Sequence, residues 1–170
     1  MRRLGFIMVA GAAMALAACN SGEGESGAAE AATPEEGAEA DAAEPVEYVK
    51  DIGLLEDGMG EELTARLAAF HGESGHDVHI AVILTTDNQD IEERAAEMIG
   101  ERGISANGAL ILIAAADENI GIVPAPGVAD AMPRDFTDAT EAEMARNFDA
   151  GDITDGFNGA VDAIIERLSS

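Results

Sequence analysis

Two runs of the sequence are apolar at almost every position, and they predict the centre of a β-sheet. Residues 79–85 and 109–115 lack the polar–apolar alternation of a half-exposed strand, so each is expected to be covered on both faces. A short extended segment at residues 48–52 and a run at residues 120–123 predict two further strands. The last strand returns as a hairpin partner after a tight turn at residues 117–119.

Segments with the apolar spacing of helices separate and follow these strands. The first begins at a cap formed by Glu56 or Asp57 and runs to about residue 71. The others are expected at residues 91–103, about 138–147 and about 152–168. The order strand, helix, strand, helix, strand, strand, helix, helix predicts an α/β fold. We expect a three-layer α/β/α sandwich with a central mixed β-sheet and helices on both faces.

The amino terminus carries a different pattern, an apolar stretch at residues 6–18 behind Arg2 and Arg3. This pattern is typical of a secretory signal, and the stretch is shorter than the roughly 20 residues of a membrane-spanning helix. It ends in Leu-Ala-Ala-Cys, which resembles the lipobox of bacterial lipoproteins. The resemblance implies a lipoprotein signal peptide at residues 1–18, cleavage before Cys19, and lipidation of Cys19. A plain secretion signal with an incidental cysteine and an uncleaved anchor are the alternatives.

Residues 19–45 predict an acidic, disordered tether between the lipid and a folded domain. After Cys19 they contain no Val, Ile, Leu or aromatic residue and no Lys or Arg. Such a segment buries too little apolar surface to offset the entropy of ordering it. As a flexible chain it would span about 25–30 Å. Residues 46–170 are then long enough to form one domain with a core of its own.

Charge and cysteine content narrow the classes of partner. The net charge of −25 argues against binding nucleic acid and against lying flat on anionic lipid, since both are negatively charged. The charge is consistent with divalent cations or a basic partner, and equally with simple solubility. Cys19 is the only cysteine, so the domain has no disulfide and no thiol for catalysis or metal binding.

The folded region resembles the TPM domain family, which occurs in bacterial envelope proteins and in a thylakoid photosystem-repair protein. The likeness rests on short motifs in a matching order rather than on one long match. They are Val-Lys-Asp-Ile-Gly-Leu-Leu at 49–55, the strand at 79–86, the helix at 92–102, Asn-Gly-Ala-Leu-Ile-Leu-Ile at 107–113, and the closing segments at 148–152 and 159–164. The family usually has an aspartate where this chain has Ala106. The resemblance implies the same α/β fold.

The resemblance also suggests a metal site. It places Asp51, Asn107 and Asp130 near one end of the sheet, where they would supply three oxygen ligands for calcium or magnesium. The missing acid at Ala106 weakens such a site. The alternative is that Asn107 and Gly108 only form a turn and that residues 127–130 only start a helix.

No catalytic residue is assigned from the sequence, because the familiar nucleophile, zinc and phosphate-loop motifs are absent. His71, His76 and His79 are interpreted as capping or surface histidines rather than as a zinc site. A second acidic set, Asp87, Asp90, Asp117 and Glu118, is expected beyond the carboxyl ends of the central strands, as caps and turn formers.

Together these features predict a lipid-anchored cell-envelope protein that acts as a binding or accessory module in membrane-protein maintenance. Its expected partners are the membrane, through the lipid, and a membrane or envelope protein. Asn20 is not the aspartate that retains Gram-negative lipoproteins at the inner membrane, which favours the periplasmic face of the outer membrane. The alternative is a metal-dependent acid phosphatase, an activity assigned to plant relatives of the family.

Overall fold

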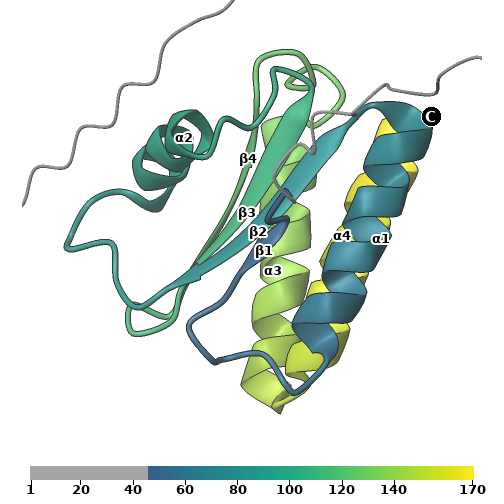
Figure 1. Ribbon diagram of the computed structural model, residues 1–170. Coiled ribbons are helices and arrows are strands. Elements are labelled where there is room, and N and C mark those ends of the chain that lie inside the picture. Colours follow the sequence, from purple (N-terminus) through teal and green to yellow (C-terminus); the bar gives the residue numbers. More distant parts are fainter. Residues whose placement is uncertain (1–45) are drawn as a thin grey trace, which may run out of the picture. The chain divides into compact units, whose positions relative to one another are not determined.

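The computed structural model describes residues 46–170, and the predicted signal peptide, Cys19 and tether lie outside the described residues. The described chain forms a four-stranded sheet in the order β1-β2-β3-β4 (Figure 1). β1, β2 and β3 run parallel, and β4 is antiparallel to β3. The strands are β1 (Val49–Lys50), β2 (Asp77–Ile83), β3 (Gly108–Ala114) and β4 (Asn119–Pro124).

Helices cover both faces of this sheet, so the predicted α/β class with a mixed sheet is confirmed. α1 (Met59–Ser74), α3 (Arg134–Ala150) and α4 (Ile153–Leu168) pack on one face, and α2 (Ile91–Glu101) packs on the other (Figure 1). Alternate residues of β2 and β3 therefore point into two separate cores. Ile80 and Ile111 belong to the larger core, whereas Ala81 and Leu112 belong to the smaller one beneath α2.

Several helix boundaries differ from the predicted ones. The expected cap by Glu56 or Asp57 is wrong: Gly58 precedes α1 in a left-handed conformation (φ 85°), and no side chain caps the helix. α3 begins at Arg134, four residues earlier than expected. Residues 127–130 form a turn and do not start a helix. The cap of α2 is confirmed, since Asp90 accepts hydrogen bonds from the backbone N–H groups of Glu92 and Glu93.

β4 forms one edge of the sheet, and the N–H groups that point outward from it are occupied. In an antiparallel pair alternate N–H groups face away from the partner strand. The N–H of Ile120 donates to the side chain of Asn119, and the N–H of Ile122 donates to Glu141. Pro124, the next outward position, has no N–H to offer. Free N–H groups on an edge strand invite pairing with another chain, so this edge is protected.

None of the helices between residues 46 and 170 is both long and apolar enough to cross a membrane.

Candidate functional site

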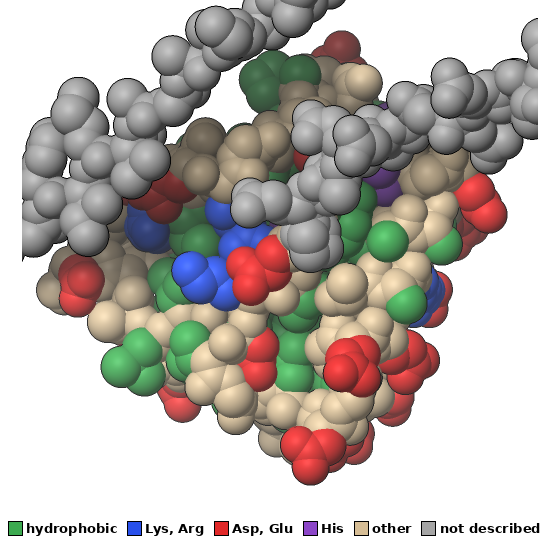
Figure 2. Space-filling view, in the orientation of Figure 1, with side chains coloured by type: hydrophobic (Ala, Val, Ile, Leu, Met, Phe, Trp, Pro, Cys, Tyr) green, Lys and Arg blue, Asp and Glu red, His purple; other side chains and the backbone are tan. Residues whose placement is uncertain are grey.

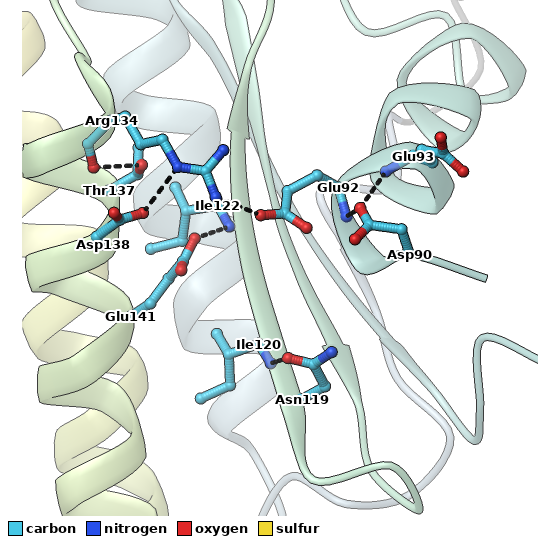
Figure 3. Close-up of polar contacts among 10 residues, drawn as sticks. All are labelled: Asp90, Glu92, Glu93, Asn119, Ile120, Ile122, Arg134, Thr137, Asp138 and Glu141. Carbon is cyan, nitrogen blue, oxygen red and sulfur yellow. Dashed lines mark hydrogen bonds and ion pairs between the residues drawn. The ribbon is translucent and has the colours of Figure 1, made fainter. Parts of the chain in front are cut away.

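A groove of about 320 Å³ lies along the outer edge of β4, between α2 and α3. Its floor is apolar: Ile122 and Met132 are almost fully buried, and Val123 and Pro124 are half-buried. Its rim is polar and charged, and Figure 3 shows these side chains converging from the two helices. The charged residues of the rim are Glu92, Arg134, Asp138 and Glu141.

The sequence of α3 explains why three of these side chains share one face. Arg134, Asp138 and Glu141 are spaced by four and three residues, which places them in a row along a helix. Pro133 occupies the N-cap position, so Arg134 is the first residue of the helix. The row faces β4 because Glu141 accepts the hydrogen bond from Ile122 at 2.7 Å.

Arg134 links the two helices across the edge of the sheet. Its Nη2 lies 3.0 Å from Oε1 of Glu92 on α2, and its Nε lies 3.6 Å from Oδ1 of Asp138 one turn further along α3 (Figure 3). The Arg134 side chain is 75% exposed, so these ion pairs are screened by solvent and contribute little to stability. Their effect is to hold the guanidinium over the groove, already engaged by two carboxylates.

Glu141 is a half-buried acid at the rim of the groove. Burial raises the pKa of its half-buried carboxyl above the usual value, and the hydrogen bond from the N–H of Ile122 only partly opposes this effect. The neighbouring charges of Asp138 and Glu92 raise the pKa further, while Arg134 lowers it. The groove therefore holds three carboxylates and one guanidinium, and the guanidinium is paired with the other two acids.

Replacing Arg134 with methionine is expected to raise the pKa of Glu141 further. Methionine resembles the apolar stem of arginine, but the substitution removes the one cation that stabilises the Glu141 carboxylate. A carboxyl-carbon NMR titration would measure the change. Arg146→Met, which removes an exposed arginine of α3 outside the groove lining, is the control and should leave Glu141 unchanged. A Glu141 titration identical in both variants would contradict this account.

The structure does not bring together the three residues predicted to bind a metal. Asp51 follows β1, whose Lys50 is level with Ala81 and Leu112, whereas Asn107 precedes β3. The two thus lie about six residues apart along the strand direction, roughly 20 Å. The carboxylate of Asp51 accepts hydrogen bonds from the N–H groups of Gly53, Leu54 and Leu55, which fix its own loop.

Asn107 and Asp130 are at least at the same end of the sheet. The N–H of Gly127 donates to Ala106, and an added Cβ at Gly127 would lie 2.6 Å from Oδ1 of Asn107. Asp130 is exposed in the turn that follows. Within residues 46–170 no three His, Cys, Asp or Glu side chains gather closely enough to hold a metal ion. The described residues therefore do not fit the calcium or magnesium site suggested by the resemblance.

The interpretation of His79 as a capping or surface histidine is wrong. His79 is only 3% exposed, and its Nε2 lies 2.8 Å from Oδ1 of Asp77, two residues earlier on β2. The other carboxylate oxygen of Asp77 accepts a hydrogen bond from the N–H of Ser105 at 2.8 Å. The ring of Tyr48 lies against His79, with 5.0 Å between ring centroids. This buried pair ties the start of β2 to the loop before β3, and we assign it a structural role.

The second acidic set is confirmed as turn and cap formers where contacts are seen. Asp117 accepts hydrogen bonds from the N–H and hydroxyl of Thr86 and from the hydroxyl of Thr85, and so ties the β3–β4 turn to the loop after β2. These bonds, led by that from the Thr86 N–H, lower the pKa of Asp117. Asp87 and Glu118 adopt left-handed backbone conformations in their turns.

The groove residues were not singled out from the sequence. Glu92, Ile122 and Glu141 are far apart in the chain and meet only through the packing of α2 and α3 around β4. Two signals were available: the spacing of Arg134, Asp138 and Glu141 after Pro133, and Pro124 at the end of a strand, which is typical of a sheet edge.

Comparison with solved structures shows the same fold in bacterial proteins of low sequence identity. The chain is similar to the N-terminal domain of a P. gingivalis protein, with a TM-score of 0.67, 17% identity, and coverage of 74% of this chain and 84% of that one. The N-terminal domain of the cg2496 protein of Corynebacterium glutamicum gives a TM-score of 0.59 at 14% identity, with coverage of 78% of this chain and 88% of that one. The BA42 protein of the psychrophilic bacterium Bizionia argentinensis gives a TM-score of 0.59 at 18% identity, with coverage of 71% of this chain and 85% of that one.

A comparison with curated protein sequences finds no match. The comparison with family models does: the model described as the TPM domain matches residues 48–167, which is almost the whole described region and more than half of the chain. The resemblance read from the short motifs is thereby confirmed. The chain belongs to the TPM domain family.

Proposed function

We propose that this protein is a lipid-anchored module of a bacterial cell envelope whose TPM domain binds a membrane or envelope protein and assists its maintenance. The observation that carries the binding role is the groove beside β4, an apolar floor with charged residues at its rim. Pockets that bind partners or ligands combine these two features. The anchoring rests on the sequence around Cys19 and on the acidic segment that follows it.

The distribution of charge favours binding over phosphate-ester hydrolysis. A phosphatase must stabilise negative charge on its substrate and in the transition state, with cations or a metal. In the described domain Arg66, Arg94, Arg102 and Arg134 each have a carboxylate partner, and Arg167 donates to a backbone carbonyl. On the face shown in Figure 2, basic side chains lie beside acidic ones. At the four paired arginines an anionic ester would have to displace a carboxylate. Lys50 and Arg146 form no ion pair among the described residues, but neither lines the groove.

Replacing Cys19 with alanine is expected to release the protein from the membrane fraction. Two or three acyl chains hold a protein firmly, whereas the described domain offers no helix that could span a bilayer. Fractionation of cells expressing wild-type and Cys19→Ala chains, with mass spectrometry of the amino terminus, would test this. A wild-type chain that is unacylated and found outside the membrane fraction would contradict the anchoring.

Partner binding can be tested with a variant that fills the groove. Ala129 lines the groove and is exposed, so Ala129→Arg should occupy the groove without disturbing the core. Ala142→Arg, at an exposed position of α3 outside the lining, makes the same change of charge. After cross-linking in cells, we expect the lipidated wild type and Ala142→Arg to co-purify with the same membrane protein, and Ala129→Arg to lose it.

Two results would overturn this function. One is that Ala129→Arg co-purifies with the same membrane protein as the wild type, or that the wild type co-purifies with no membrane protein. The other is turnover of p-nitrophenyl phosphate by residues 20–170 above the buffer rate, with or without added calcium, which would favour the phosphatase.

A further inference from the structure

We infer that the groove beside β4 receives a lysine or arginine side chain from an exposed segment of the partner protein. This inference rests on the proposed binding function of the same groove and names the chemistry of the partner. It is carried by the shape of the groove, by the arrangement of its charges, and by the blocked edge of β4.

The groove carries more negative than positive charge, which favours the binding of a cation. Arg134 is paired with Glu92 and Asp138, and Glu141 has no ion-pair partner within residues 46–170. Of the two oxygens of Glu141, Oε1 accepts the hydrogen bond from Ile122, and no hydrogen bond to Oε2 is formed by the described residues. Partial burial strengthens the attraction between this carboxylate and any cation that binds beside it, because the local dielectric is lower than that of water. An added ammonium or guanidinium group would offset part of this excess negative charge.

The rest of the domain adds to this preference. Without the two arginines and eight acidic residues of segment 1–45, the net charge of −25 becomes −19 for residues 46–170. A field of this sign attracts basic segments and raises their rate of encounter.

The floor of the groove suits the stem of such a side chain. Lysine and arginine carry three or four methylene groups that lie along apolar surface while the charged head reaches a polar rim. Ile122, Met132 and Pro124 supply this surface, and Glu141 lies on α3 at the rim. The volume of about 320 Å³ is at the small end for ligand pockets, which fits a single side chain better than a large ligand.

The sheet edge argues for recognition of a side chain rather than of a peptide backbone. A peptide that adds a strand to an edge needs free N–H groups on it. On β4 the N–H groups of Ile120 and Ile122 are already bonded, and Pro124 has none.

The test uses residues 20–170, labelled with nitrogen-15, and a probe peptide, acetyl-Ala-Lys-Ala-amide. Two of the similar structures are N-terminal domains determined on their own in solution, so we expect this fragment to fold. The amide of Ile122 is the reporter because it donates to Glu141. We expect its NMR signal to shift saturably with the peptide, and the same peptide acetylated on the lysine Nε, which keeps the stem but loses the charge, to bind at least about tenfold more weakly.

Matched variants separate the groove from general attraction between opposite charges. Glu141→Gln should weaken binding of the lysine peptide about tenfold or more, whereas Glu143→Gln, an exposed position of the same helix outside the lining, should leave it unchanged. Equal weakening by both variants, equal binding of the two peptides, or no saturable shift would each overturn the inference. So would a saturable shift of the same amide by calcium chloride at lower concentration than the peptide. If the groove-dependent capture of a membrane protein succeeds while the lysine peptide fails, only this inference falls.

Discussion

Replacing Gly108 with alanine is expected to lower the free energy of unfolding by about 3 kcal/mol. A Cβ at this position would lie 2.4 Å from the carbonyl oxygen of Asp77, 2.5 Å from Cγ2 of Ile104 and 3.1 Å from the carbonyl oxygen of Ser105. Two of these atoms belong to the backbone, and Gly108 is paired with Asp77 in the central strands, so neither side can retreat without breaking the sheet. Chemical denaturation followed by circular dichroism measures the loss.

Gly100→Ala provides the control for this experiment. Gly100 lies in α2, and an added Cβ there would meet no atom within 4 Å. Alanine should therefore stabilise the helix by up to about 1 kcal/mol, since glycine is a poor helix former. If Gly108→Ala were as stable as the wild type, the close approach of the loop before β3 to the start of β2 would be incorrect.

Replacing Asp77 with asparagine is expected to cost about 2 kcal/mol near neutral pH, the range for hydrogen bonds to a buried charged group. The carboxylate lies between His79 and the N–H of Ser105 and is largely buried. Burial alone would raise the pKa of Asp77, but the hydrogen bonds from Ser105 and His79 outweigh it, and the net effect lowers the pKa.

The sign of the pH dependence follows from that lowered pKa. A carboxyl whose pKa is lower in the folded than in the unfolded state stabilises the fold above its unfolded value, about 3.9, and loses this effect as the pH falls through the folded value. The difference in stability between wild type and Asp77→Asn should therefore be full at pH 6 and shrink below about pH 4. Asp149→Asn, at an exposed site, removes the same charge and should show no such difference. A difference that grows with acid would refute the assignment.

The central strands were predictable from the sequence, except at their start. β2 begins at Asp77, two residues before the predicted run, because Asp77 is charged and interrupts the apolar pattern. Asp77 and His79 enter the sheet only because each satisfies the other, and a single sequence gives no sign of that pairing. The start of α3 was missed for a related reason: the helix opens with the charged residues Arg134 and Asp135, although Pro133 marked the boundary.

The groove could not be predicted, because its residues are joined only by tertiary packing. Glu92 lies on α2, and it meets Arg134 only because α2 and α3 flank the same edge of the sheet. For Asp51 and Asn107 the resemblance was misleading, because it predicted that these two residues lie close together. The register of β1 against β2 and β3 separates them, and register depends on pairing partners that a pattern of single residues does not contain.

The occupied edge of β4 has a consequence for the proposed anchoring to a membrane. Proteins held to a surface meet their neighbours repeatedly in similar orientations, which favours the growth of cross-β stacks from any exposed strand. Here a proline, an asparagine and a glutamate leave the outward N–H groups of that strand no opening for an incoming chain. At the other edge β1 is only two residues long. If the domain is anchored as proposed, neighbouring copies are therefore not expected to join through the N–H groups of β4.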